Sequence, residues 1–245
     1  MQEHRFERFE RLVGRQGLQR LGAASVAVVG VGGVGSYAAE ALVRAGLGRL
    51  TLIDFDRIVP SNINRQVHAL EQTVGQLKVE AMAARCRNIH PAIQVFPRAV
   101  PYDAGTAAEL LEGGFDYLCD CIDGITAKLH LIESCRRRRI PIISSMGAAN
   151  KLDPTLIRVG DLAETRHCRM ARVMRRELGR RGIRTGVKVV YSLEEFHSLD
   201  DNRPHRETAP GRRPRITLGS SSYIPPLFGL TLAGAVIREL LKPMD

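Results

Sequence analysis

The residues best suited to chemistry begin with a glycine-rich run near the N-terminus. Gly30, Gly32, Gly33 and Gly35 form a G-x-G-x-x-G pattern, directly after an apolar, β-branched stretch and before a stretch with helical spacing. Glycines let backbone N–H groups approach phosphate oxygens, and the start of a helix adds a favourable partial charge. Asp54 ends the next apolar stretch, where a carboxylate can accept hydrogen bonds from ribose hydroxyls. The pattern predicts a nucleotide site, which ATP, a nicotinamide or a flavin would fit.

Cationic side chains after this run favour ATP over a redox cofactor. Arg65 lies in the stretch SNINRQ (61–66), and Lys78 follows at the start of a predicted helix. Attack of a carboxylate on the α-phosphate of ATP gathers negative charge and releases pyrophosphate, both of which fixed cations stabilise, whereas hydride transfer needs no such cations. Arg65 alone could be a surface ion-pair residue, and Lys78 alone part of a solvated helix face. The prediction of an adenylating enzyme therefore rests on the two together.

A parallel sheet is needed to bring these residues to one edge. Five apolar stretches predict strands, at 25–29, 49–53, 93–96, 117–121 and 140–144. Stretches with helical spacing lie before and between them, at 5–20, 36–44, 78–89, 106–111 and 125–138. This alternation indicates an α/β fold, a doubly wound, Rossmann-like, mostly parallel sheet, with a nucleotide-binding core over 1–150.

The chain changes character after the core, yet we expect it to extend the same globule, as one domain over 1–245. Residues 151–215 predict a basic helix and then a polar, proline-rich mobile loop at 197–215. Residues 216–245 predict a strand at 216–218 and a final core helix that begins at Pro225 and Pro226. Four arginines recur at helical spacing on one face of the basic helix, at Arg169, Arg172, Arg176 and Arg180.

The composition favours a globular protein with a polyanionic partner. The 245 residues are 44% hydrophobic, which is enough for a core, and the formal net charge is +10. Such a charge favours nucleic acid, and next an acidic membrane surface, over an inert basic surface. The N-terminus lacks the apolar segment of a secretory signal, and the apolar stretch 227–237 is too short to span a bilayer, so we expect no membrane span.

The five cysteines indicate a reducing, cytoplasmic compartment. No two of them have C-x-x-C spacing, so we expect neither a zinc site nor structural disulfides. Cys168 lies in the arginine-rich region and is a candidate thioester nucleophile. An incidental cysteine is the favoured interpretation, because neither an adjacent base nor a helix start is evident in the sequence.

From about Arg5 to Gly147 the chain resembles the ThiF/MoeB/ubiquitin-activating superfamily of adenylating enzymes. The resemblance rests on the glycine loop, the stretch DFD (54–56), the pattern Asn62-x-x-Arg65-Gln66, Lys78 and the stretch DCID (120–123). It implies an ATP site formed by Gly30, Gly32, Gly33, Gly35, Asp54, Asp56, Asn62, Arg65, Gln66, Lys78 and Asp123.

The resemblance also assigns roles to individual residues. It implies that Arg65, Lys78 and Asp123 are catalytic and that Asp123 holds Mg²⁺ near the phosphates. From the residues alone, Asp123 could equally cap the helix that begins near Ile125. The resemblance further implies a homodimer, in which Arg8 or Arg11 of the neighbouring subunit reaches the ATP.

Within the superfamily, the chain is similar to the tRNA threonylcarbamoyladenosine dehydratase subgroup. The similarity includes RLTLID (49–54), NRQVHAL (64–70), DPT (153–155) and DLA (161–163), and it implies tRNA as partner, with the arginine face at 169–180 following its phosphates. It also implies an ATP-dependent cyclisation: the carboxylate of the threonylcarbamoyl group becomes an acyl-adenylate, and a ureido nitrogen then closes the ring. Some relatives carry a cysteine before the final helix, where this chain reads ITLG (216–219).

Two alternatives remain open at this point. The chain could adenylate the C-terminus of a ubiquitin-like sulfur-carrier protein, although relatives of that type commonly carry paired C-x-x-C motifs. It could also be a nucleotide-sensing module or a nicotinamide oxidoreductase, against which Arg65, Lys78 and Asp123 argue. A sulfur-relay protein is a further candidate partner.

Overall fold

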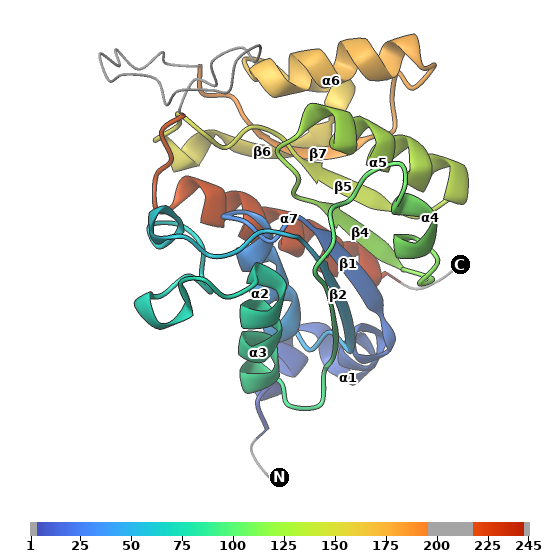
Figure 1. Cartoon of the computed structure of the whole chain (residues 1–245). Coiled ribbons are helices and arrows are strands. Elements are labelled where there is room, and N and C mark those ends of the chain that lie inside the picture. Colours follow the sequence, from blue (N-terminus) through green and yellow to red (C-terminus); the bar gives the residue numbers. More distant parts are fainter. Residues whose placement is uncertain (1–3, 196–217, 243–245) are drawn as a thin grey trace.

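The chain folds around a seven-stranded sheet with the strand order β3-β2-β1-β4-β5-β7-β6 (Figure 1). The computed structural model describes residues 4–195 and 218–242. All neighbouring strands are parallel except β6 and β7, which are antiparallel. The strands are β1 (Ser25–Val29), β2 (Arg49–Ile53), β3 (Gln94–Arg98), β4 (Tyr117–Asp120), β5 (Ile142–Ser145), β6 (Ile157–Asp161) and β7 (Lys188–Ser192). The predicted doubly wound, mostly parallel fold is confirmed.

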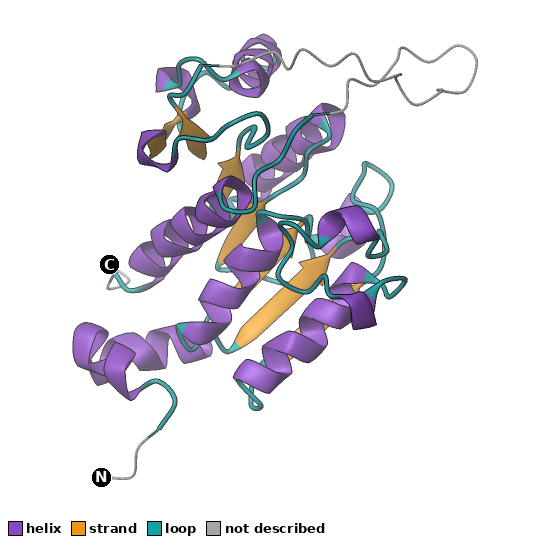
Figure 2. Ribbon diagram, turned by 90° about the vertical axis from the view of Figure 1, so that its left-hand side faces the viewer, coloured by secondary structure: helices purple, strands orange, loops and turns teal. Residues whose placement is uncertain are grey.

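Helices cover both faces of this sheet (Figure 2). They are α1 (Glu7–Ala23), α2 (Gly35–Arg44), α3 (Lys78–Ile89), α4 (Ala107–Leu110), α5 (Ile125–Arg138), α6 (Arg169–Arg180) and α7 (Ile224–Leu240). Val26 and Val28 of β1 pack in one core with α2, α3 and α7, whereas Ala27 and Val29 pack in a second core with α4, α5 and α6. Because successive strand residues point to opposite faces, a strand covered on both sides must be apolar throughout.

The helix before the first strand begins two residues later and ends three residues later than expected, and it is kinked. α1 begins at Glu7 and ends at Ala23, and Gly14 interrupts it with a φ of +74°. A left-handed φ of this kind suits glycine, which lacks the Cβ atom that makes it costly for other residues. The final helix begins at Ile224, with the two prolines in its first turn as predicted, where their missing N–H groups leave no hydrogen bond unmade.

The residues after the core add two strands that the sequence analysis did not predict. β7 pairs in parallel with β5, and β6 pairs with β7 at the edge of the sheet. β6 has only half-buried and exposed residues, so its apolar signal is weak. The predicted loop at 197–215 and the first two residues of the predicted strand at 216–218 lie outside the described residues. Leu218 belongs to no strand.

Within residues 4–195 and 218–242, none of the helices combines the length and apolar character that crossing a membrane requires. All five cysteines are free, and all except Cys121 are buried.

Candidate active site

The carboxyl ends of β1 and β4 form the topological switch point of the sheet. On one side of β1 lie β2 and β3, and on the other side lie β4 and β5. Ligands of open α/β sheets bind in the crevice beyond such a point. The glycine loop at 30–35 leaves β1 here, and Asp123 follows the end of β4. The fold therefore brings these two parts of the predicted site to the same edge.

The glycine loop is packed too closely to admit a side chain at Gly30 or at Gly35. Gly30 has a φ of +87°, and a Cβ atom on it would lie 2.7 Å from the carbonyl oxygen of Cys121. A Cβ atom on Gly35 would lie 1.8 Å from the carbonyl oxygen of Gly30. The loop thus folds back on itself and against the end of β4 immediately before α2 begins. Gly32, Gly33 and Val34, between these two glycines, are half-buried, which suits a loop that would bind a phosphate through backbone N–H groups.

Asp54 joins the end of β2 to the glycine loop. Its carboxylate accepts hydrogen bonds from the backbone N–H of Val31, at 2.6 Å, and of Asp56, at 2.8 Å. Burial raises the pKa of Asp54 from its ordinary value, while the positive charge of Lys78 opposes the rise. The carboxylate thus lies at the end of β2 against the glycine loop, and its predicted role in binding ribose hydroxyls stays a prediction.

Lys78 is a buried cation and not part of a solvated helix face. It is 6% exposed, and its Nζ atom donates a hydrogen bond of 2.6 Å to Oδ2 of Asp56. Its backbone N–H also donates to the carbonyl oxygen of Asp56, at 3.0 Å, where α3 begins. The helix start and the ion pair together fix the ammonium group beside the Asp54 carboxylate.

Arg65 lies over the glycine loop. Its Cγ and Cδ atoms are 3.2 Å and 3.4 Å from the place that a Cβ atom on Gly33 would take. Its guanidinium donates to the carbonyl oxygen of Ser61, at 2.9 Å, and to Oδ1 of Asn64, at 2.8 Å. Within the described part of the chain it forms no ion pair with a carboxylate. Its charge is therefore not neutralised there, which fits a phosphate ligand better than a surface ion pair.

Two buried amide side chains belong to the same segment as this cation. Asn62 is 7% exposed and accepts a hydrogen bond from the N–H of Val59, at 3.2 Å. Gln66 is 4% exposed, and its Nε2 atom is 3.9 Å from the place of a Cβ atom on Gly32. The Oε1 atom of Gln66 has no hydrogen-bond partner among the described residues. Gln66 and Arg65 thus lie beside the glycine loop, and Asn62 precedes them in the same segment.

Asp123 is exposed and lies between the end of β4 and the start of α5. The N-cap residue of α5 is Gly124, and no side chain caps this helix, so the capping alternative is wrong. The described residues include no cluster of three or more metal-ligating side chains. A single free carboxylate still suits Mg²⁺, which commonly binds through one or two carboxylates, phosphate oxygens and water.

The two N-terminal arginines do not reach the site within one chain. Arg8 and Arg11 belong to α1, which precedes β1 and lies at the opposite, amino end of the sheet (Figure 1). Arg8 is exposed, and Arg11 pairs with Glu7 at 2.5 Å. Only a second subunit could bring either of them to a nucleotide at the carboxyl end.

The predicted arginine face is exposed on α6. This helix lies at the far side of the molecule from α1 (Figure 1), and its buried residues are Ala171, Met174 and Leu178. Glu177 lies between two of the arginines and forms ion pairs with both. The exposed residues of the face are Arg169, Arg172, Arg176 and Arg180.

Cys168 does lie at a helix start, which the sequence analysis did not recognise. It is the N-cap residue of α6, and its Sγ atom accepts a hydrogen bond from the N–H of Ala171, at 3.5 Å. It is also 6% exposed, which closes the thiol to a large substrate. An incidental cysteine therefore remains the favoured interpretation of Cys168, because its thiol is buried.

A buried network beside the site joins Asp120, which begins the stretch DCID, to two residues that the sequence analysis did not single out. Asp120, Lys128 and Ser144 are all wholly buried, and the lysine Nζ lies 2.8 Å from Oδ2 of the aspartate. The residue type of Lys128 does not indicate burial, because a lysine within a helix is expected to be solvated. Its position does indicate burial, because Leu129, Leu131 and Ile132 beside it belong to a buried core.

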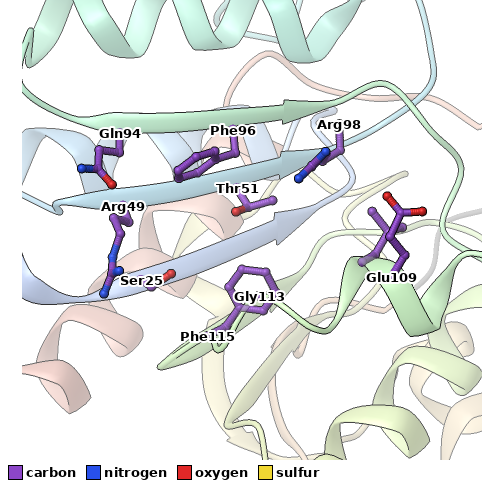
Figure 3. Close-up of a pocket in the computed structure, with 10 residues that line it drawn as sticks. Ser25, Arg49, Thr51, Gln94, Phe96, Arg98, Glu109, Gly113 and Phe115 are labelled. Carbon is purple, nitrogen blue, oxygen red and sulfur yellow. The ribbon is translucent and has the colours of Figure 1, made fainter.

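A cavity of about 260 Å³ opens elsewhere, over β2 and β3 (Figure 3). Phe96 and Arg98 of β3, Arg49 of β2 and Phe115 line it. It exists because only the short helix α4 connects β3 to β4 on this face, so part of the sheet has no helix over it. No residue of the glycine loop borders it, and it is not the predicted nucleotide site.

Comparison with known proteins places this geometry in context. The sequence pattern of the ThiF family matches residues 6–244. The tRNA threonylcarbamoyladenosine dehydratase of Bacillus subtilis is 42% identical over 213 residues, which are 86% of this chain and 84% of that protein. The molybdopterin-synthase adenylyltransferase of Escherichia coli is 37% identical over 117 residues, 47% of this chain and 45% of that protein.

Solved structures resemble the whole chain. The crystal structure of E. coli tRNA N6-threonylcarbamoyladenosine dehydratase in complex with AMP has a TM-score of 0.88 and 34% identity, and the alignment covers 97% of this chain and 94% of that one. The ATP complex of the same protein has a TM-score of 0.85 and 35% identity, with 97% and 93% covered. The similarity thus includes the residues after the nucleotide-binding core.

Proposed function

The chain belongs to the ThiF family, and from this premise we propose that it catalyses the ATP-dependent cyclisation of N6-threonylcarbamoyladenosine in tRNA. The observation that carries the proposal is the pair of cations at the glycine loop. Lys78 is held buried by Asp56, and the stem of Arg65 lies over Gly33. This arrangement suits a triphosphate that is attacked at its α-phosphorus, and a nicotinamide would not use it.

Similarity over the whole chain favours this substrate over a carrier protein. The dehydratase of B. subtilis matches 86% of the chain, whereas the molybdopterin-synthase adenylyltransferase matches 47%. An adenylating core is common to both types of relative. The residues that follow the core, including β6, α6 and β7, align with the solved dehydratase structures, and they supply the basic surface that a tRNA substrate requires.

The side chains at the sheet edge account for the first step of the reaction. The glycine loop and α2 hold the phosphates through backbone N–H groups, and Asp54 accepts hydrogen bonds from the ribose hydroxyls. A carboxylate oxygen of the substrate attacks the α-phosphorus, and the bond to pyrophosphate breaks. Lys78 and Arg65 stabilise the negative charge that gathers on the phosphate oxygens, and Asn62 and Gln66 orient the segment that carries Arg65.

The second step needs less from the protein. A ureido nitrogen of the threonylcarbamoyl group attacks the activated carbonyl carbon and loses its proton, and AMP leaves with the former carboxylate oxygen. The sum of both steps is loss of one water from the substrate, with conversion of ATP into AMP and pyrophosphate. Intramolecular attack has a high effective molarity, so the enzyme must chiefly hold the activated acid in place and exclude water.

Asp123 would hold a Mg²⁺ ion together with phosphate oxygens. When bound, the ion would neutralise part of the charge on the phosphates and on the leaving pyrophosphate. The exposed carboxylate at the carboxyl end of the sheet supports this role, since it does not cap α5.

The partners follow from the charged surfaces. The α6 arginines would follow tRNA phosphates, since phosphate contacts give affinity and orientation without reading sequence. A homodimer would allow Arg8 or Arg11 of one protomer to approach the ATP of its partner. A reaction on tRNA that is fed by ATP would take place in the cytoplasm.

The proposed function is tested with the purified protein, ATP, Mg²⁺ and tRNA that carries the linear modification. Mass spectrometry of the digested nucleosides should show a product lighter by one water, in equal amount to the AMP formed. If AMP forms only when a ubiquitin-like protein ending in Gly-Gly is added, the carrier-protein alternative replaces the proposal.

A further inference from the structure

A wholly buried ion pair lies behind the loop that carries Asp123. Oδ2 of Asp120, at the end of β4, is 2.8 Å from Nζ of Lys128 on α5, and both residues are 0% exposed. The hydroxyl of Ser144 on β5 donates to the same carboxylate oxygen, at 2.6 Å, and lies 3.1 Å from the lysine Nζ. Two strands and one helix therefore meet at a single carboxylate.

Stability alone does not account for such a pair. Removing two charges from water is costly, and replacement of a buried ion pair by apolar side chains of similar volume is often neutral or stabilising. Asp120 and Lys128 lie among apolar residues of β4 and α5, where such a replacement would fit. Fixing one particular geometry is a use that buried ion pairs have in some proteins.

The pair closes both ends of the four-residue loop 121–124. At its beginning, Oδ1 of Asp120 accepts a hydrogen bond from the N–H of Ile122, at 3.2 Å. At its end, the N–H of Lys128 donates to the carbonyl oxygen of Gly124, at 3.0 Å, which is a first-turn bond of α5. The ion pair then joins these two ends directly, so the loop cannot widen without breaking it.

The closed loop is also the wall of the glycine cradle. The N–H of Cys121 donates to the carbonyl oxygen of Val29, at 2.8 Å. The carbonyl of Cys121 lies where a Cβ atom on Gly30 would have to go. A shift of the loop would therefore move Asp123 and open the cradle together.

We propose that Asp120 and Lys128 are positioning residues that hold the loop 121–124, and with it the Asp123 carboxylate, at a fixed place opposite the glycine loop. Both are wholly buried, so their side chains would act through the loop that they hold. The expected change in Mg²⁺ binding rests on the proposed function, whereas the expected change in the opening of the loop does not. Groups that orient a metal-binding residue typically change metal affinity or activity about 10–100-fold when they are lost.

The test uses the double variant Asp120→Asn/Lys128→Met, which removes both charges and leaves no uncompensated ion. An asparagine keeps an oxygen for the N–H of Ile122. We expect hydrogen exchange of the amides at 121–125 to accelerate about tenfold or more, because the loop is no longer closed. The Mg²⁺ concentration that gives half-maximal AMP formation should rise about 10–100-fold.

A second ion pair provides the matched control. Glu40 on α2 is 9% exposed and pairs with Arg85 on α3. The variant Glu40→Gln/Arg85→Met should lower the melting temperature without changing exchange at 121–125 or the Mg²⁺ dependence. If the Asp120 and Lys128 variant does not fold, Ser144→Ala, which keeps both charges, should shift both readouts in the same direction by a smaller factor.

The outcomes separate two possible failures. Unchanged exchange at 121–125 in a folded Asp120→Asn/Lys128→Met variant would overturn the positioning role, whatever the activity. Equal effects from the Glu40 and Arg85 control would also overturn it, since they would reflect general loosening. A wild-type protein that forms no AMP would overturn the proposed function instead, and hydrogen exchange would still decide the positioning role.

Discussion

The Nζ atom of Lys78 lies 2.6 Å from Oδ2 of Asp56, at the first residue of α3. The lysine is 6% exposed, whereas the aspartate side chain is half exposed. One partner is thus held within the protein, and the other faces the solvent at the carboxyl end of the sheet. The pair can open toward a phosphate without burying an uncompensated charge, which is the property that an adenylating site needs.

Lys78→Ala should abolish adenylation while leaving the fold intact. Loss of a fixed cation at the transferring phosphate costs about 10²–10³-fold in rate, and the remaining Asp56 carboxylate is solvated, so stability should change little. Exchange of labelled pyrophosphate into ATP measures the first step, and circular dichroism checks the fold. Pyrophosphate exchange at the wild-type rate would remove Lys78 from the site.

Gly35→Ala should disrupt the phosphate cradle. Its Cβ atom would lie 1.8 Å from the carbonyl oxygen of Gly30, so the loop must move. Gly234→Ala in α7 is the control, because nothing lies within 4 Å of the added Cβ atom. For Gly35→Ala we expect the free energy of unfolding to fall by about 1–3 kcal/mol and ATP binding to be lost. For the control we expect unchanged or improved stability. Urea titration and calorimetry measure both, and tight ATP binding by Gly35→Ala would contradict the cradle geometry.

His68 should make the protein less stable in weak acid. Burial, with smaller effects of the Lys78 and Arg85 charges, lowers the pKa of His68 to about 4, and neither ring nitrogen has a partner within the described residues. Because the histidine takes up its proton at higher pH in the unfolded state than in the folded state, protonation favours unfolding. The folded state therefore has its full stability above pH 6.5 and loses part of it as the pH falls toward 4. The difference amounts to at most about 3 kcal/mol.

Urea unfolding at pH 7.5 and pH 5 measures this dependence. His68→Gln, which does not titrate, should flatten the pH dependence over that interval. An equally steep decline in the variant would assign the effect to other groups.

Reversing the charge of Arg172 and Arg176 together should weaken tRNA binding. Each lost phosphate contact should also lower the slope of log K against log salt concentration by about one. Arg138→Glu at the end of α5 is the control, since it changes the net charge outside α6. Fluorescence titration with labelled tRNA at several salt concentrations measures both quantities. Equal losses in the control would mean that overall charge, and not α6, attracts the tRNA.

The parts of the site that could be predicted are those whose chemistry is local in sequence. The glycine loop follows directly from strand, turn and helix chemistry, and Asp54 follows from the length of one βα unit. The sequence identifies Arg65 and Lys78 as cations of the site, but it does not predict which groups surround them. Whether Lys78 is solvated or buried depends on Asp56 and on where α3 begins, which only the fold determines.

Contacts between distant segments could not be predicted. Lys128 becomes a buried ion because Asp120 and Ser144 come from two neighbouring strands. Cys168 becomes an N-cap residue because α6 begins one residue later, a boundary that sequence periodicity places poorly. β6 was missed because an edge strand with half-exposed residues lacks the apolar alternation that identifies a strand.

The central claim is that the substrate carboxylate becomes a mixed anhydride with AMP at this site. Transfer of an oxygen isotope tests it most directly. If tRNA labelled with ¹⁸O in the threonylcarbamoyl carboxylate is converted by the protein with ATP, mass spectrometry of the released nucleotide should find one ¹⁸O atom in the phosphate of AMP. Release of unlabelled AMP, or the appearance of the label in inorganic phosphate, would contradict the account.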